Sequence, residues 1–383
     1  MIKKQKAHSL TGRITLELML LAFHSVKRNR GAAGIDKVSV AMFEANLLDN
    51  LIALMDDLKK GTFEPYPLRR AYIPKNATEF RPLGIPAVRD RIAQEVVRRL
   101  LEPLFEPLFH PSSYGFRPGR NCHQAVESAL ELHRAGHLVI LDADIKKFFD
   151  MIPHHVIMEA IANEVADGNI LRLIDQFLSS GVMEDGVFKP TTVGTPQGGV
   201  ISPLLANITL NAFDWQLDQA GYRFIRYADD FVVLCQSQAE AKEALDLVTH
   251  ILKNLELHLS PEKTHITTYG KGYSFLGFQI SSRSVRMRPK SVEKLKEKVR
   301  DITRRCHNFD AQIVGKLNQV IRGTANYFAT AFSHCQWQFH HLDQWIRMRL
   351  RCMRYKRKSR HDNWRMRQKY FRCLGLLEFS AFC

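Results

Sequence analysis

Two adjacent aspartates, Asp229 and Asp230, lie between two short apolar runs, residues 224–225 and 231–234. This pattern predicts a β-hairpin with both carboxylates at its turn. Each carboxylate raises the free-energy cost of ionising the other, unless a divalent cation between them neutralises both. The pair therefore indicates a magnesium site. An ordinary polar turn is the alternative interpretation when the pair is taken alone.

A third carboxylate follows a separate strand pattern. The apolar run 138–141 leads into Asp142 and Asp144, and the pattern changes from strand to helix over residues 146–150. Carboxylates from two strand ends can hold two hard cations through oxygen ligands and leave positions open for substrate phosphates. In such a site one metal activates a primer hydroxyl and the other stabilises the leaving pyrophosphate. The aspartates thus predict metal-dependent nucleotidyl transfer.

The positive charge of the chain is concentrated in its last hundred residues. The chain has 55 Lys and Arg against 39 Asp and Glu, a net charge of +16, and residues 281–383 alone contain 24 basic and 7 acidic residues. Apolar residues recur there at helical spacing in three sets. The sets are Val292, Leu295, Val299 and Ile302; Ile313, Leu317 and Ile321; and Phe339, Leu342, Ile346 and Leu350. We expect three amphipathic helices whose cationic faces bind nucleic acid through phosphates.

Seven cysteines are scattered along the chain without a C-x-x-C pair. An odd number without paired spacing favours reduced thiols and argues against a zinc site. No run of residues is long and apolar enough to suggest a transmembrane helix. We therefore expect a cytoplasmic protein with no membrane partner.

A series of sequence blocks occurs in one order along the chain. The blocks lie at residues 28–36, 73–75, 81–86, 113–120, 144–150, 194–199, 227–230, 261–264 and 275–278. In order and spacing they resemble the successive motifs of the reverse transcriptases encoded by bacterial group II introns, over about residues 25 to 360. Such a series in register is far less frequent by chance than any one block.

The resemblance implies an α+β fold of the right-hand polymerase type. Fingers and a palm with an antiparallel sheet would occupy residues 1–280, and a basic all-α thumb, called domain X, would occupy residues 281–383. Many proteins of this family continue into a longer DNA-binding region, whereas this sequence stops at Cys383. We therefore expect a short or truncated DNA-binding end.

The resemblance also assigns the metal site. It implies that Asp144, Asp229 and Asp230 are the catalytic carboxylates, that the carbonyl of Ile145 is a backbone metal ligand, and that Asp142 is a polar neighbour. The implied cofactor is a pair of Mg²⁺ ions, which Mn²⁺ can replace.

Five positions are expected at the incoming nucleotide. They are Lys75, Arg81, Phe149, Gln197 and Lys263. The ring of Phe149 would clash with a ribose 2′-hydroxyl and so select deoxynucleotides, although either it or Phe148 should be a core aromatic. Arg81 can bind phosphate oxygens in bidentate fashion. For Lys75 the alternative interpretation is a solvated surface residue with no nucleotide contact. Gln197 would reach the nucleotide or template, and Lys263 would donate a proton to pyrophosphate.

Further resemblances concern the nucleic acid. The block Phe275, Leu276, Gly277 and Phe278 resembles the primer grip, with a strand of the palm core as its alternative. Arg117 and Arg120 lie in the block near the template path and are expected phosphate contacts. In the thumb, the expected contacts are Arg347, Arg351, Arg354, Lys356, Arg357 and Lys358.

Taken together, the resemblance implies an RNA-directed DNA polymerase that uses an RNA template, a DNA primer and dNTPs. Binding of intron RNA and maturase activity in retrohoming would accompany it, with intron RNA as the candidate template. Two alternatives stay open. The chain could act mainly as an RNA-binding splicing cofactor, or it could be a related enzyme recruited to phage defence, CRISPR adaptation or DNA repair.

Overall fold

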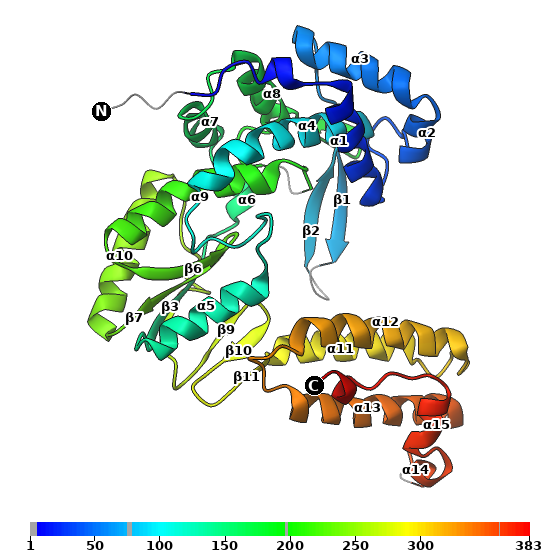
Figure 1. Ribbon diagram of the computed structural model, residues 1–383. Coiled ribbons are helices and arrows are strands. Elements are labelled where there is room, and N and C mark those ends of the chain that lie inside the picture. The colour runs from blue at the N-terminus through cyan, green and yellow to red at the C-terminus, as the bar shows by residue number, and fades with distance from the viewer. Residues whose placement is uncertain (1–5, 75–78, 196–197, 360) are drawn as a thin grey trace. The chain divides into compact units, whose positions relative to one another are not determined.

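The computed structural model describes residues 6–74, 79–195, 198–359 and 361–383. The chain divides into two compact units, which we call the first and the second unit. The first contains Met1–Ala125 and Leu141–His265, and the second contains Val126–Ile140 and Ile266–Cys383 (Figure 1). The sequence instead predicts a single division near residue 280. In the described parts of the chain, no helix is both long and apolar enough to cross a membrane.

Four helices open the first unit. They are α1 (Leu16–Arg28), α2 (Val40–Ala45), α3 (Leu47–Lys60) and α4 (Val88–Phe105). The Thr15 hydroxyl caps α1 by accepting a hydrogen bond from a backbone N–H of its first turn. Helix α1 packs against α3 and α4.

A four-stranded sheet with the order β2-β1-β4-β5 forms the part that resembles the fingers. Its strands are β1 (Leu68–Pro74), β2 (Phe80–Ile85), β4 (Val182–Glu184) and β5 (Val187–Lys189). Strands β1 and β2 are antiparallel, β1 and β4 are parallel, and β4 and β5 are antiparallel. The β1–β2 pairing places Arg81 opposite Ile73.

A second four-stranded sheet, with the order β6-β7-β3-β8, carries the predicted metal site. Its strands are β6 (Arg223–Tyr227), β7 (Asp230–Cys235), β3 (Val139–Asp144) and β8 (His265–Thr268). Strands β6 and β7 form an antiparallel hairpin. Helix α9 (Ser202–Gln219) packs on β6 and α10 (Gln238–Asn254) packs on β7 (Figure 1). Residues 231–235 of β7 are almost completely buried, as the continuous apolar run predicts.

The remaining helices up to residue 179 connect these sheets. They are α5 (Cys122–Arg134), α6 (Phe148–Met151), α7 (His154–Ala162) and α8 (Gly168–Ser179). Two short 3-10 helices lie elsewhere, η1 (Thr11–Arg13) before α1 and η2 (Glu106–Leu108) directly after α4. Helix α6 begins four residues after Asp144, so the predicted change from strand to helix is confirmed.

The second unit combines a small sheet with helices. Its sheet has the order β11-β10-β9, built from β9 (Tyr273–Phe275), β10 (Phe278–Ile280) and β11 (Val285–Met287). The helices are α11 (Pro289–Ile302), α12 (Ala311–Phe328), α13 (Gln336–Tyr355), α14 (Asp362–Arg365), α15 (Gln368–Cys373) and the 3-10 helix η3 (Phe379–Phe382). The first three contain the three apolar sets found in the sequence, so that prediction is confirmed. The antiparallel sheets and the helical C-terminal region also confirm the predicted α+β class.

One acidic side chain in the first turn of α4 is buried, which disfavours its ionised form. Asp90 is 1% exposed and accepts a hydrogen bond from the backbone N–H of Tyr66 at 3.0 Å. The Nε of Arg89 lies 3.6 Å from its second oxygen. Burial raises the pKa of Asp90 from 3.8 to about 7, although Arg89 lowers it in part.

We predict that Asp90→Asn flattens the pH dependence of stability. Between pH 4 and 7 the folded carboxyl keeps a proton that the unfolded chain has lost, so the free energy of unfolding of the wild type falls as the pH rises. Three pKa units correspond to roughly 4 kcal/mol over this range, and the variant should lack this contribution. Urea unfolding of both proteins at several pH values measures it. Equal slopes for the two proteins would contradict the prediction.

Candidate active site

The turn between β6 and β7 carries the paired aspartates. Tyr227 pairs with Asp230 across the hairpin, so Ala228 and Asp229 form a two-residue turn. Ala228 has a φ of +60°, in the left-handed region that such hairpin turns require and that glycine adopts most readily. The predicted hairpin tip is therefore confirmed, with Asp229 in the turn and Asp230 at the start of β7.

The third aspartate ends the neighbouring strand. Asp144 is the last residue of β3, which lies beside β7 in the sheet. Its backbone carbonyl accepts a hydrogen bond from the N–H of Ser260 at 2.8 Å, and Ile145 forms a β-bridge with Leu259. The Nζ of Lys263 lies 2.7 Å from Asp144 Oδ2. The loop after α10 thus brings Lys263 directly onto the predicted metal ligand.

The charges of Asp144, Lys263 and Arg81 all act on Asp229. Burial raises the pKa of Asp229, and the nearby charge of Asp144 raises it further. The positive charges of Lys263 and Arg81 lower it. These interactions indicate that the two carboxylates and the two cations face one region, although they come from separate parts of the first unit.

The donor set suits a hard cation. A divalent ion between Asp144 and Asp229 would remove the repulsion that raises the pKa of Asp229, and carboxylate oxygens are the ligands that Mg²⁺ prefers. In the parts of the chain that the structure describes, no three His, Cys, Asp or Glu side chains gather closely enough to form a metal site by themselves. Mg²⁺ is usually held by one or two carboxylates together with waters and substrate phosphates. The residues therefore fit an ion whose coordination a nucleotide completes.

The two adjacent phenylalanines of α6 differ in burial. Phe148 is 1% exposed and belongs to the core, whereas Phe149 is half-buried. Their ring centroids lie 5.3 Å apart. The Phe149 carbonyl accepts a hydrogen bond from the N–H of Thr195 at 2.7 Å, which fixes α6 against the glycine-rich block. Phe148 is thus the core aromatic, and Phe149 is only partly buried.

The glycine-rich block shows why glycine is needed there. Gly194 has a φ of +88°, and a Cβ at this position would lie 2.7 Å from the carbonyl oxygen of Asp150.

Of the other expected nucleotide contacts, Arg81 is exposed on β2. Lys75 and Gln197 lie outside the described residues.

The block that resembles the primer grip lies in the second unit. Phe275 and Phe278 pair across β9 and β10, and both are 0% exposed. Leu276 and Gly277 form the turn between them, with φ values of +45° and +86°. The Leu276 carbonyl accepts a hydrogen bond from the hydroxyl of Tyr327 at 2.8 Å. The two phenylalanines therefore match the core alternative, and only the turn residues are left for a primer contact.

The structure assigns Arg117 to the interior. It is 7% exposed, pairs with Glu106 at 2.8 Å, and donates to the carbonyls of His110 and Ser113 at 2.7 Å each. The N–H groups of its guanidinium are used for hydrogen bonds within the protein. This corrects the expectation that Arg117 contacts phosphate. Arg120 is half-buried and stacks on the ring of Tyr114.

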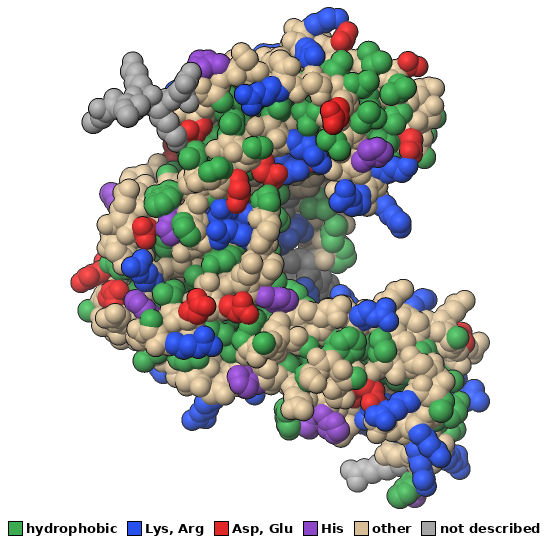
Figure 2. Space-filling view, viewed as in Figure 1, with side chains coloured by type: hydrophobic (Ala, Val, Ile, Leu, Met, Phe, Trp, Pro, Cys, Tyr) green, Lys and Arg blue, Asp and Glu red, His purple; other side chains and the backbone are tan. Residues whose placement is uncertain are grey.

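Two of the thumb arginines are also used by the fold. Arg347 is 8% exposed and pairs with Glu378 at 3.2 Å, and Arg351 is half-buried and donates to the carbonyl of Met366 at 3.0 Å. Neither is placed as a surface phosphate contact. The remaining four expected residues, Arg354, Lys356, Arg357 and Lys358, are exposed, although Arg357 also pairs with Asp362 at 3.1 Å and Lys356 donates to the His307 carbonyl at 3.1 Å. Figure 2 shows further Lys and Arg side chains gathered over α14 and α15.

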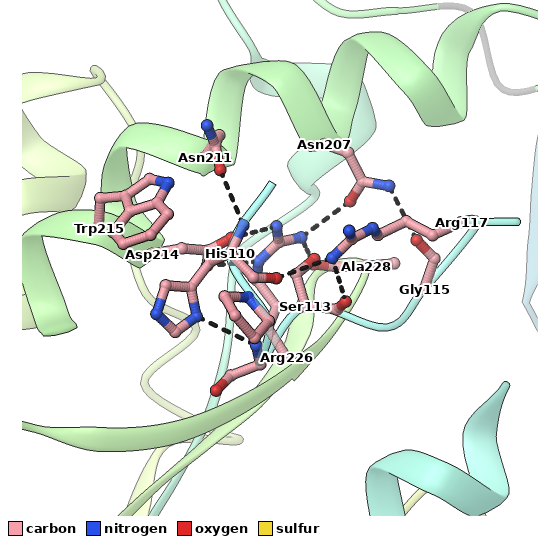
Figure 3. A network of polar contacts seen from close by, with 12 residues as sticks. His110, Ser113, Gly115, Arg117, Asn207, Asn211, Asp214, Trp215, Arg226 and Ala228 are labelled. Atoms are coloured by element: carbon pink, nitrogen blue, oxygen red, sulfur yellow. Dashed lines mark hydrogen bonds and ion pairs between the residues drawn. The ribbon is translucent and has the colours of Figure 1, made fainter. Parts of the chain in front are cut away.

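Beneath the catalytic turn lies a polar network that the sequence analysis missed. Arg226, fully buried on β6, pairs with the equally buried Asp214 of α9 and also contacts Asn207 and the Ala228 carbonyl (Figure 3). The only signal in the sequence is a charged residue inside an otherwise apolar strand pattern, directly before Tyr227. Its buried acidic partner, 12 residues earlier, has no pattern of its own.

Comparison with known proteins agrees with this geometry. Residues 73–280 match the family described as reverse transcriptase (RNA-dependent DNA polymerase), and residues 292–371 match the group II intron, maturase-specific domain. Protein YkfC of Escherichia coli (strain K12) is 34% identical over 287 residues, covering 64% of this chain and 75% of YkfC. Group II intron-encoded protein LtrA of Lactococcus lactis subsp. cremoris is 30% identical over 337 residues, covering 70% of this chain and 55% of LtrA. The chain thus spans only about half of LtrA. It belongs to the reverse transcriptase family and carries the maturase-specific domain of group II intron proteins.

Proposed function

We propose that the chain is an RNA-directed DNA polymerase that extends a DNA primer on an RNA template. The observation that carries the proposal is the placement of Asp144 at the end of β3 and of Asp229 and Asp230 at the hairpin of the neighbouring strand β7. Family membership supports the same reaction, and reverse transcriptases generally use divalent metal ions. The finer proposal is two Mg²⁺ ions held by Asp144, Asp229, Asp230 and the Ile145 carbonyl.

The surrounding residues have separate tasks in this reaction. When bound, the ions would supply activation of the primer hydroxyl and stabilisation of the pyrophosphate charge. Arg81 would bind the triphosphate, because its guanidinium is exposed and acts electrostatically on Asp229. Lys263 neutralises Asp144 in the free protein and carries a proton that it can donate at Nζ to the leaving group. The half-buried ring of Phe149 would exclude the ribose 2′-hydroxyl.

Replacing both turn carboxylates should abolish synthesis. We expect Asp229→Ala with Asp230→Ala to extend no primer on an RNA template with Mg²⁺ and dNTPs, because the ions lose their protein ligands. Circular dichroism should show an unchanged fold. The matched control is the other adjacent aspartate pair, Asp56→Ala with Asp57→Ala on α3, which should retain wild-type extension. Equal extension by the turn variant and the wild type would disprove the assignment.

Shortening the Phe149 side chain should weaken sugar selection. We predict that Phe149→Val lowers the ratio of kcat/KM for a dNTP over the matching rNTP by roughly 100-fold, because the clash with the 2′-hydroxyl is relieved. Single-nucleotide incorporation on one template measures both values. Phe148→Leu is the control, since it alters the adjacent core ring and should lower stability without changing sugar selectivity. An unchanged ratio in the Phe149 variant would exclude this role.

A second function is favoured by the maturase-specific match over residues 292–371 and by the exposed cations that end α13. We propose that the second unit binds intron RNA and promotes its splicing. The named relatives come from bacteria, which supports a bacterial cytoplasm as the place of action.

Splicing should be separable from synthesis. We expect the Asp229→Ala, Asp230→Ala variant to splice the flanking intron RNA at the wild-type rate, since the carboxylates act only in nucleotidyl transfer. Charge reversal of the exposed Arg354 and Lys358 to Glu should weaken RNA binding and reduce its salt dependence. Splicing assays and filter binding at several salt concentrations test both. An intron that splices equally well without the protein would remove the maturase role.

A further inference from the structure

The turn that carries Asp229 has a backbone conformation that needs support. Ala228 has a φ of +60°, where any residue other than glycine is strained. It is also 7% exposed, so its polar backbone groups are largely removed from water. A strained conformation of this kind persists only when the surrounding structure holds it.

The support is a buried guanidinium. Arg226 is 0% exposed, and its Nη1 donates to the Ala228 carbonyl at 3.0 Å (Figure 3). The same nitrogen donates to Asn207 Oδ1 at 3.0 Å, while Nε and Nη2 donate to the Asp214 carboxylate at 2.7 and 2.5 Å. A guanidinium is a rigid planar fork. Fixing it against two side chains of α9 therefore fixes the direction of the donor that reaches Ala228.

A second contact holds the turn from the segment before α5. A Cβ on Gly115 would lie 2.4 Å from the backbone nitrogen of Ala228, so the backbone of Gly115 packs directly on the turn. The Nδ2 of Asn207 donates to the Gly115 carbonyl at 2.8 Å. Asn207 thus ties both the guanidinium and the packed segment to one helix.

This arrangement is poorly explained by stability. Burying an ion pair removes the hydration of both charges, and apolar side chains of similar size often serve folding as well or better. Apolar side chains cannot supply a directed donor to the Ala228 carbonyl. A metal-binding carboxylate, in contrast, must be held to within about 0.5 Å of its productive position.

We propose that Arg226 is a positioning residue for nucleotidyl transfer. Together with Asp214 and Asn207 it fixes the Ala228 carbonyl and, through the turn, the place of the Asp229 carboxylate beside Asp144. This inference rests on the proposed polymerase function.

The test exchanges the ion pair for apolar side chains. Arg226→Met with Asp214→Leu removes the donor to Ala228 without leaving an unpaired buried charge. We expect the variant to fold, with a circular dichroism spectrum like that of the wild type. The kcat for single-nucleotide primer extension should fall roughly 100-fold, because a misplaced ligand affects the transition state. The KM for the dNTP should change less than about threefold, since ground-state binding is made elsewhere.

Two further variants separate position from stability. Arg226→Lys keeps a charge opposite Asp214 but lacks the planar fork, so it should also lose kcat, and it decides the question if the double variant does not fold. Leu173→Ala truncates a fully buried side chain on α8, away from the turn. It should lower the unfolding midpoint and leave kcat unchanged below that temperature.

The outcomes distinguish failure of the positioning inference from failure of the polymerase proposal. A folded Arg226 variant with wild-type kcat overturns the inference and leaves the polymerase proposal standing. A Leu173→Ala protein with the same loss of kcat also overturns it, because the effect is then one of stability. A wild type that extends no primer at any Mg²⁺ concentration overturns the polymerase proposal and this inference with it.

Discussion

The placement of two acidic side chains on adjacent strands, Asp144 at the end of β3 and Asp229 in the turn before β7, is the constraint on which the candidate site depends. Burial already raises the pKa of Asp229, and the charge of Asp144 adds to that rise. Like charges favour separation, so the backbone must keep the two carboxylates in the same region when no cation is present. Ends of adjacent, hydrogen-bonded strands do this better than flexible loops. Lys263 and Arg81 offset part of the cost by bringing positive charge to the same region.

Backbone strain also occurs near the candidate site. Ala228 in the hairpin turn and Lys147 before α6 both have positive φ values, +60° and +46°. Each lies within three residues of one of the proposed metal-binding aspartates, and neither is glycine. Gly194 packs on the carbonyl of Asp150 with no room for a side chain. The backbone therefore takes unfavourable conformations on both sides of the carboxylates, and buried contacts stabilise them.

The parts of the site that sequence patterns could predict are those that local periodicity controls. Short continuous runs of apolar residues located the strand ends, and with them Asp144, Asp229 and Asp230. Whether Phe148 or Phe149 enters the core could not be predicted, because both fall on one short helix and only tertiary packing distinguishes them. The arginines show most clearly what local sequence patterns cannot predict. Arg117 and Arg347 are as basic as any surface residue, yet carboxylates distant in the sequence bind them inside the fold. Arg226 was missed for the same reason, since its partner Asp214 is identified only by burial.

The division of the chain into units has a consequence for how it is made. Residues 126–140 belong to the second unit, although the rest of that unit is residues 266–383. This stretch includes Val126, Ala129 and Leu130, whose side chains are buried in the finished protein. During synthesis they leave the ribosome well before their later neighbours exist. No single cut of the polypeptide can release either unit whole, so the second unit cannot be excised as one contiguous fragment.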